Sequence, residues 1–166
     1  MPEREILDLD VLFVGAGPAS LAGAIQLKRL FNESGSEASV AVLEKASEVG
    51  AHSLSGAIFD PRSLIELFPD YKERNVPFEA EVLEEHMYYL MKGKKLPFPY
   101  VPPSMRHHGC YVTSIGKFTR WLGERAEEEG VDIFCGFPGT DFIYDGDKVI
   151  GVKTGDRGID KNGERK

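Results

Sequence analysis

The segment from Val11 to Glu44 has the pattern of a β-strand, a glycine turn, a helix and a second β-strand, and it constrains the fold more than any other part of the chain. Apolar residues 11–14 precede the turn Gly15-Ala16-Gly17-Pro18-Ala19-Ser20. Gly15 lets the chain turn sharply out of a strand, and Gly17 lets the backbone approach a phosphate without a Cβ in the way. The following helix would present its free N–H groups and positive dipole end to that phosphate. The segment therefore predicts a βαβ unit that binds a dinucleotide.

The residues after the turn support this interpretation. Apolar residues recur at helical spacing, so that one face can pack on a sheet: Leu21, Ala24, Ile25, Leu27 and Phe31. The unbroken apolar run 40–43 is typical of a parallel strand covered on both faces. Glu44 ends that run, where a carboxylate can accept both hydroxyls of an adenosine ribose and would repel a 2'-phosphate. This favours FAD or NAD over NADP. A glycine-rich turn in an unrelated α/β protein is the alternative, but it leaves Glu44 unexplained.

Composition excludes several other classes. The chain has 166 residues, 42% of them hydrophobic, which is enough for one core. The formal net charge is −7 and no basic stripe is present, so nucleic acid is not an expected partner. We find neither a run of eighteen apolar residues nor a basic, apolar leader.

Metal and thiol chemistry are not expected either. The two cysteines, Cys110 and Cys135, are too few for a four-thiolate site, and we expect buried thiols. The four histidines, His52, His86, His107 and His108, have no convincing ligand spacing, and we interpret them as loop residues.

The region after Glu44 predicts a connection and then an insertion. Small residues from Gly50 to Gly56 could lie close to a cofactor, or form an ordinary flexible loop. Asp60-Pro61 predicts the start of a short apolar helix that ends before Pro69. Residues 87–91 suggest a strand, 92–95 a turn, and 96–103 an extended proline-rich arm. Its aromatic rings beside lysines could rest at a membrane interface, or pack on a neighbouring domain.

The βα pattern resumes at residues 110–113, which we expect to rejoin the nucleotide-binding fold. Ser114 would cap a helix with one apolar face, formed by Phe118, Trp121, Leu122 and Ala126, which ends at Gly130. Residues 131–135 are a third candidate strand for the parallel sheet, and 141–152 a β-hairpin with a half-exposed face. Residues 155–166 contain one aliphatic side chain and no closing element. We therefore expect the chain to be the N-terminal piece of a longer protein.

Several motifs together closely resemble the start of the electron-transfer flavoprotein:ubiquinone oxidoreductases. They are GAGPAS, LEK, GAHSLSGAIFDPRSLIELFPD, LPFPYVPPSMRHHGCYVTSIGKFTRWLGERAEEEGV and VKTGDRGI, and they cover essentially the whole chain. The glycine turn is shared by many flavoproteins, whereas GAHSLSGA followed by DPRSLIELFPD is specific to the family. Family members are several times longer than this chain.

The resemblance implies an α/β fold, a glutathione-reductase-type, Rossmann-like FAD-binding domain that is incomplete here. It implies FAD-binding residues 1–60, an insertion 61–104 from a ubiquinone- and membrane-facing domain, and a continuation of the FAD domain over 105–166. Ser20 stands where the family usually has a third glycine, which should alter helix packing and leave the pyrophosphate contact intact. The family also holds one [4Fe-4S] cluster on four cysteines, which are absent from this chain.

The resemblance further implies the site residues. Gly15, Gly17, Ser20 and Glu44 would hold the ADP half of FAD, and the loop Gly50–Gly56 would lie toward the flavin. The complete set of expected cofactor-binding residues is Gly15, Ala16, Gly17, Pro18, Ala19, Ser20, Glu44, Lys45, Gly50, Ala51, His52, Ser55 and Gly56. The residues expected to dip into the membrane are Ile58, Phe59, Leu64, Ile65, Leu67 and Phe68. We expect no catalytic acid, base or nucleophile, because the flavin and cluster perform the redox chemistry.

The implied activity is electron transfer from reduced electron-transfer flavoprotein to ubiquinone, at a monotopic membrane contact. We expect this fragment to be inactive alone. Its place would be the cytoplasmic face of a bacterial inner membrane, or the mitochondrial inner membrane if the start is a trimmed eukaryotic one. The alternatives are a related FAD-dependent dehydrogenase or geranylgeranyl-reductase-like flavoprotein, and a non-catalytic nucleotide-binding fragment.

Overall fold

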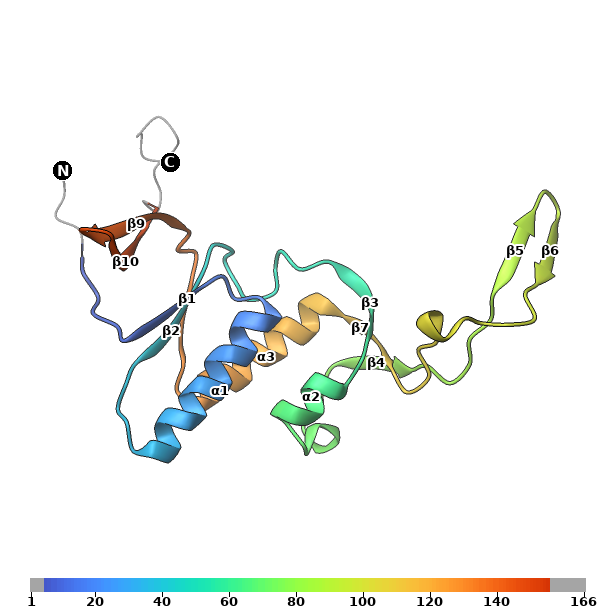
Figure 1. Ribbon diagram of the computed structural model, residues 1–166, viewed down its shortest axis with the longest axis horizontal. Coiled ribbons are helices and arrows are strands. Elements are labelled where there is room, and N and C mark those ends of the chain that lie inside the picture. Colours follow the sequence, from blue (N-terminus) through green and yellow to red (C-terminus); the bar gives the residue numbers. More distant parts are fainter. Residues whose placement is uncertain (1–4, 156–166) are drawn as a thin grey trace. The chain divides into compact units, whose positions relative to one another are not determined.

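The computed structural model of the chain describes residues 5–155, and these divide into two units. The first unit comprises the described residues up to Ser53 and from Thr119 onward, and the second comprises Leu54–Phe118. The elements of both are labelled in Figure 1.

The first unit is built on a parallel sheet of three strands. Its strands are β1 (Val11–Val14), β2 (Val40–Glu44) and β8 (Asp132–Cys135), in the order β1-β2-β8. Val40, Ala41 and Val42 of the central strand are almost completely buried, which confirms that β2 is covered on both faces. Within the described residues β1 pairs with β2 only. The predicted βαβ unit and its third strand are therefore confirmed.

Helix α1 (Pro18–Ser34) connects β1 to β2 and packs on the sheet through its predicted apolar face. Leu21, Ala24 and Ile25 are buried in this contact. Gly23 brings the helix especially close to β1, because a Cβ added there would lie 3.3 Å from the Phe13 ring. The close helix–strand packing that the sequence analysis associated with a third glycine is thus present at Gly23, one helical turn after Ser20.

Helix α3 (Ile115–Glu129) begins in the second unit and continues into the first. Trp121, Leu122 and Ala126 are buried, as predicted, and the helix ends before Gly130, whose φ is +93°. Figure 1 shows α1 and α3 side by side, and the guanidinium of Arg29 on α1 lies 2.6 Å from the Glu129 carboxylate on α3. The two helices are therefore joined near their C-terminal ends.

The predicted hairpin consists of β9 (Gly139–Asp145) and β10 (Lys148–Thr154), which pair antiparallel in a sheet of their own. Gly146 in its turn has a φ of +57°. Every residue of β9 is exposed, including Phe142 and Tyr144 and also Ile143 between them, so the predicted pattern of one covered and one exposed face is not seen.

The second unit contains an antiparallel sheet that the sequence analysis did not predict. Its order is β3-β7-β4, formed by β3 (Ser55–Phe59), β7 (Tyr111–Ser114) and β4 (Phe78–Glu81). The predicted strand and the helix after it are confirmed, but β7 pairs antiparallel with both of its neighbours and lies in the second unit rather than with the nucleotide-binding strands. The strand was recognised, but the partner of a strand depends on residues far away in the sequence.

An aromatic cluster forms the core of the second unit. The Phe78 ring stacks on the Tyr111 ring with centroids 4.2 Å apart, and Phe59 packs against Phe118 with centroids 4.6 Å apart. The Tyr111 hydroxyl lies 3.3 Å from that of Tyr71, and this hydrogen bond, with burial, raises the pKa of Tyr111 to about 12.

Residues 86–106 form a segment of the second unit that we call the arm. It contains β5 (Tyr88–Met91), β6 (Lys94–Pro97) and a single 3₁₀ turn, η2 (Pro103–Met105). Strands β5 and β6 pair antiparallel around the turn Lys92-Gly93, and Gly93 has a φ of +77°. The predicted strand is confirmed, but residues 94–97 form a second strand where we expected turn and extended arm.

The predicted short helix is α2 (Arg62–Leu67), followed by a 3₁₀ turn, η1 (Tyr71–Glu73). The Asp60 carboxylate accepts a hydrogen bond from the Arg62 backbone N–H at 3.1 Å, but the residue at the N-cap is Pro61, one position later than predicted. The structure places residues 54–60 and 105–118 in the second unit, whereas we expected them with the nucleotide-binding part. Residues 156–166 of the C-terminal segment lie outside the described residues.

Within residues 5–155, no helix is both long enough and apolar enough to cross a bilayer.

The starts of β1 and β2 are joined by a pair that the sequence analysis missed. The Asp10 carboxylate accepts hydrogen bonds from the backbone N–H and the hydroxyl of Ser39, both at 2.8 Å. The hydrogen bond from the Ser39 backbone, above all, holds the pKa of Asp10 below its ordinary value of 3.8. The carboxylate therefore fixes the start of one strand to the start of the next.

We predict that Asp10→Ala lowers the free energy of unfolding at neutral pH. A depressed pKa stabilises the folded state above the unfolded-state value of 3.8, and this contribution is lost as the pH falls through the lower folded-state value. The difference between variant and parent should therefore shrink below pH 3.8. Urea unfolding followed by circular dichroism, at neutral pH and below pH 3.8, measures this difference in the free energy of unfolding. Asp147→Ala, in the exposed β9–β10 turn, is the control. A difference independent of pH would contradict this account.

We predict that Gly23→Val destabilises the chain by about 1–3 kcal/mol, because its side chain would push α1 away from Phe13. Gln26→Val places the same β-branched residue on the exposed face of α1 and controls for helix propensity. Thermal unfolding compares the two variants. Equal losses would show that the close approach at Gly23 contributes nothing.

Candidate dinucleotide-binding site

The glycine turn begins directly after β1 and has a backbone conformation that requires glycine. Gly15 has a φ of +100°, in the left-handed region, and its N–H donates to the Leu43 carbonyl of β2 at 2.7 Å. Ala16 follows and is buried. The role predicted for Gly15, a sharp turn out of the strand, agrees with this geometry.

Gly17 is not required by the protein's own conformation. Its φ of −80° and ψ of 166° are open to any residue, and a Cβ added there would meet no atom of residues 5–155 within 4 Å. The protein itself therefore leaves room for a side chain at Gly17. A ligand close to this backbone would compete for that space, which is the demand that a bound pyrophosphate makes.

The first turn of α1 is suited to an anion. No side chain caps the helix, no acid lies in its first turn, and Pro18 has no N–H to satisfy. The first intrahelical bond runs from the Leu21 N–H to the Gly17 carbonyl at 3.0 Å. The N–H groups of Ala19 and Ser20 therefore precede the regular hydrogen-bond pattern, and with the helix dipole they can bind a phosphate.

Glu44 ends β2 beside this turn, as predicted, and its carboxylate is held by the backbone. One oxygen accepts from the Ala16 N–H at 2.9 Å, and the other accepts from the Ala46 N–H at 2.7 Å. Each carboxylate oxygen can accept a second hydrogen bond, so acceptor positions remain for two ribose hydroxyls. The Ala16 N–H is thus used within the protein, whereas the sequence analysis assigned Ala16 only to the cofactor.

The end of β8 supports the same corner. The Phe137 N–H donates to the Glu44 carbonyl at 2.9 Å, and the Gly136 N–H donates to the Ala46 carbonyl at 2.7 Å. Cys135 pairs with Glu44 in the sheet register. Burial, and then the negative charge of Glu44, raise the pKa of the Cys135 thiol, which is therefore uncharged at neutral pH. Cys110 and Cys135 are only partly buried, whereas we expected buried thiols.

The loop after Glu44 rests on α3 through residues that sequence reasoning missed. The Arg120 guanidinium lies 2.9 Å from the Glu48 carboxylate, and a Cβ at Gly123 would lie 3.1 Å from Val49. The sequence signal that could have predicted this contact is Gly123, because a glycine inside a helix often marks a close packing contact. Lys45, Ala51 and His52 are exposed along this loop, and Gly50 has a φ of +82°.

The remaining residues expected at the cofactor belong to the second unit. Ser55 and Gly56 are exposed and begin β3, where Gly56 has a φ of +83°. The structure therefore brings Gly15, Ala16 and Glu44 together in one unit. That Ser55 and Gly56 contact the same cofactor stays a prediction.

The residues expected to dip into a membrane do not form one exposed surface. Leu64 and Phe68 are only 3% and 1% exposed, so for these two the expectation was wrong. Their apolarity serves the core of the second unit, where helical spacing turns both inward. Ile58 and Ile65 are exposed, and Phe59 and Leu67 are partly buried.

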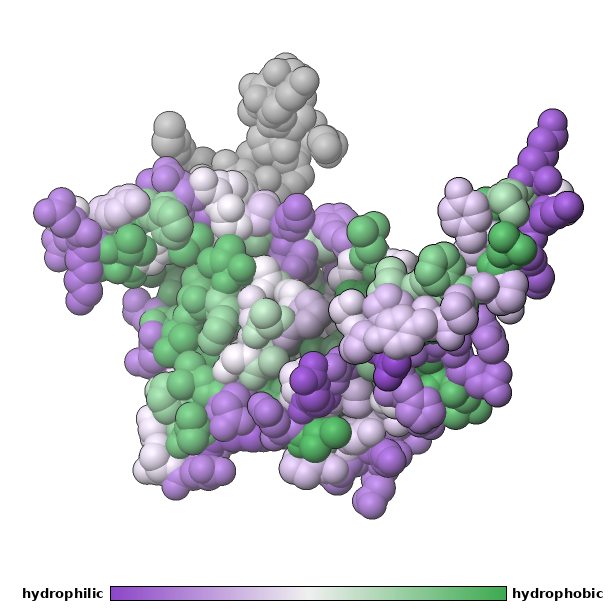
Figure 2. Space-filling model, turned by 45° about the vertical axis from the view of Figure 1, so that its right-hand side comes forward, coloured by the Kyte–Doolittle hydropathy of each residue, from purple (hydrophilic) through white to green (hydrophobic). Residues whose placement is uncertain are grey.

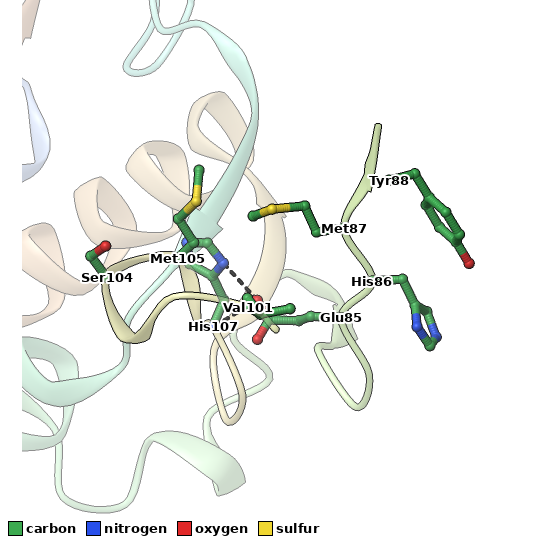
Figure 3. Close-up of a pocket in the computed structure, with 8 residues that line it drawn as sticks. All are labelled: Glu85, His86, Met87, Tyr88, Val101, Ser104, Met105 and His107. Carbon is green, nitrogen blue, oxygen red and sulfur yellow. Dashed lines mark hydrogen bonds and ion pairs between the residues drawn. The ribbon is translucent and has the colours of Figure 1, made fainter. Parts of the chain in front are cut away.

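An open hollow of about 560 Å³ lies at the base of the arm. Its lining residues all belong to the second unit: Glu85, His86, Met87, Tyr88, Val101, Ser104, Met105 and His107. Figure 3 shows Met87 on the side of Met105 and His107, whereas His86 and Tyr88 point away from them. The Glu85 carboxylate accepts from the His107 backbone N–H at 2.7 Å and lies 2.7 Å from its Nδ1. These contacts, chiefly the backbone one, lower the pKa of Glu85.

The described residues include no group of three or more histidine, cysteine or acidic side chains that could bind a metal ion. His107 pairs with Glu85, and His86 lies 3.4 Å from Glu84.

Comparison with known proteins gives close relatives in sequence. Over 98% of its length the chain is 47% identical to the probable electron transfer flavoprotein-ubiquinone oxidoreductase of Acinetobacter baylyi, of which it covers 29%. Over 99% it is 46% identical to the electron transfer flavoprotein-ubiquinone oxidoreductase of Pseudomonas aeruginosa, of which it covers 30%. The mitochondrial enzyme of Mus musculus is 42% identical over 99% of the chain, which covers 27% of it. No family model matches the chain.

Solved structures share the fold at lower identity. A geranylgeranyl bacteriochlorophyll reductase-like protein from Thermoplasma acidophilum superposes with a TM-score of 0.60 at 21% identity. The match covers 87% of this chain and 34% of the chain of that protein. CtdE, solved in complex with FAD, has a TM-score of 0.58 at 18% identity and covers 89% of this chain and 35% of its own. Both support the Rossmann-like α/β architecture described above.

The chain spans about 30% of the length of the curated relatives it matches. By sequence across nearly its whole length, it belongs to the electron transfer flavoprotein-ubiquinone oxidoreductase family as a segment of that size.

Proposed function

We propose that this chain supplies the ADP-binding part of an FAD-dependent oxidoreductase that passes electrons from reduced electron transfer flavoprotein to ubiquinone. The observation that carries the proposal is the corner formed by Gly15, Gly17 and Glu44, in a chain whose relatives are named for this reaction. The same proposal includes two further points. The fold is of the glutathione-reductase type, and the FAD-binding domain is incomplete in this chain.

The residues present fit the ADP half of FAD. Ala19 and Ser20 can donate backbone N–H groups to the pyrophosphate, and no atom of the described residues lies within 4 Å of a Cβ added at Gly17. The Glu44 carboxylate can accept the two ribose hydroxyls while its backbone hydrogen bonds keep it in place. Gly50, Ala51, His52, Ser55 and Gly56 are proposed to lie toward the flavin.

When bound, the flavin supplies the electron-transfer chemistry. The residues of this chain bind and orient it, and we assign no proton transfer to any of them. A [4Fe-4S] cluster requires four ligands, which Cys110 and Cys135 cannot provide, so no step is assigned to a cluster in this chain. That this chain is inactive on its own stays an expectation.

The alternatives fit the comparisons less well. A geranylgeranyl-reductase-like flavoprotein or a related dehydrogenase rests on fold similarity at 21% identity, against 41–47% for the proposed family. A non-catalytic nucleotide-binding fragment would take up FAD or ADP without flavin reduction, and reduction by electron transfer flavoprotein in the full-length protein separates it from our proposal.

We predict that Gly17→Leu leaves the fold intact and weakens FAD binding by at least about 100-fold. The chain has room for the side chain, but the pyrophosphate would lose two or more hydrogen bonds of about 1.5 kcal/mol each. Flavin fluorescence titration measures binding, and thermal unfolding measures stability. Ser34→Leu, at the other end of α1, is the control. A stable Gly17→Leu variant with unchanged FAD affinity would refute the phosphate role.

We also propose that the protein makes a peripheral membrane contact and that the arm forms it. Aromatic and aliphatic side chains on both faces of the β5–β6 hairpin are exposed, among them Tyr88, Tyr89, Leu90 and Leu96. In Figure 2 the arm carries hydrophobic and hydrophilic side chains side by side, with hydrophilic ones at its tip. Amphipathic surfaces of this kind bind the interface between lipid headgroups and acyl chains. Ile58 and Ile65 can add to the contact, whereas Leu64 and Phe68 are buried.

We predict that replacing Leu90, Leu96 and Phe98 together by Ser weakens pelleting with vesicles of phosphatidylcholine and phosphatidylglycerol by at least about tenfold. Less apolar area would then enter the interface. The matched control replaces Phe142, Val149 and Ile150, which are similarly exposed on the β9–β10 hairpin. If both triple variants pellet like the parent chain, the arm makes no apolar membrane contact.

A further inference from the structure

We propose that the lysines at the tip of the arm bind the headgroup phosphates of anionic phospholipids, so that the arm selects acidic membranes. The inference rests on the membrane contact proposed above and adds the class of lipid. It is supported by the positive charge of the arm, by the contacts of its cations and by the register of its hairpin.

The arm is positively charged in an acidic protein. The chain has a formal net charge of −7, yet residues 86–106 contain four lysines and arginines and no aspartate or glutamate. The cations are Lys92, Lys94, Lys95 and Arg106. Such a separation of charge would attract a negatively charged surface to this one segment.

These cations have no acidic partner within the part of the chain that the structure describes. The contacts they make are of another kind. The Lys95 ammonium lies 4.7 Å from the centre of the Tyr88 ring, and the Arg106 guanidinium lies 5.5 Å from that of Tyr100. Arg106 also donates to the Val101 carbonyl at 3.1 Å. Each of these two cations is thus paired with an exposed ring, so that a ring can bury at the lipid boundary while its cation contacts a phosphate.

The hairpin register places the lysines around the tip. Leu90 pairs with Lys95 and Met91 with Lys94, so the two lysines lie on opposite faces, and Lys92 occupies the turn. Each face therefore combines apolar residues with one lysine. Insertion tip-first would take all three ammonium groups into hydrocarbon, which is costly. The favourable arrangement is a hairpin along the interface, with the lysine of its lower face reaching back to the phosphates along its flexible stem.

The base of the arm is closed, so that these groups are presented as one surface. The Phe98 N–H donates to the Met87 carbonyl at 2.8 Å, and just outside the arm Glu85 binds His107. Glu85 is thereby occupied by His107 at the base. A partner protein with an acidic patch could use the same cations, but exposed apolar residues on both faces of a two-stranded hairpin favour a lipid interface.

The test measures binding of the chain to two kinds of vesicle, pure phosphatidylcholine and an equal mixture of phosphatidylcholine and phosphatidylglycerol. The variant replaces Lys92, Lys94 and Lys95 by Glu. The control replaces Lys72, Lys148 and Lys153 by Glu, which changes the net charge equally at exposed positions outside the arm. Circular dichroism verifies that both variants fold.

We expect the parent chain and the control to bind the acidic vesicles more tightly than the neutral ones. The arm variant should lose on the order of 100-fold in affinity for acidic vesicles, at about fivefold for each lysine. Raising the ionic strength should weaken the binding of the parent.

Equal binding of parent and arm variant to both vesicles would overturn the lipid selectivity and leave the membrane contact standing. Equal losses in the arm variant and the control would show that net charge, rather than the arm, controls binding, and would also overturn it. Binding of the parent to neither vesicle would overturn the membrane contact itself, and the selectivity with it.

Discussion

The Glu44 carboxylate connects the two halves of the βαβ unit, and the candidate site depends on this connection. Its two oxygens accept from the N–H groups of Ala16 and Ala46, one on each side of the corner between the glycine turn and β2. The carboxylate therefore fixes the turn against the strand before any ligand binds. A site that is already ordered loses less entropy when its ligand arrives.

The sequence predicted those parts of the fold that depend on short-range patterns. The strand 11–14, the helix with Leu21, Ala24 and Ile25 buried, and the apolar strand 40–43 follow from periodicity and from glycine in a left-handed conformation. The buried face of α3 was equally clear from its spacing. In each case the signal lies within one helix or one strand and its flanking residues.

The sequence could not reveal which distant residues meet. Strand β7 was recognised, but its antiparallel pairing with β3 and β4 joins segments more than thirty residues apart. Leu64 and Phe68 were assigned to a membrane from the resemblance to the family, and their residue types could not correct this, because an apolar side chain looks the same whether it faces lipid or a protein core. Gly23 and Asp10 were missed for the same reason, since their partners, Phe13 and Ser39, lie in other elements.

The glycines of the first unit differ in what a substitution would disturb, and this has a consequence for the protein in a cell. At Gly15 and Gly23 a side chain conflicts with the protein's own backbone conformation or packing, so such variants would be partly unfolded and removed by proteases. At Gly17 an added Cβ meets no described atom of the protein, and on the function proposed above it would displace only the cofactor. On that proposal a variant at this position would escape quality control and accumulate as an intact, cofactor-free protein, and its defect would not appear in measurements of protein abundance.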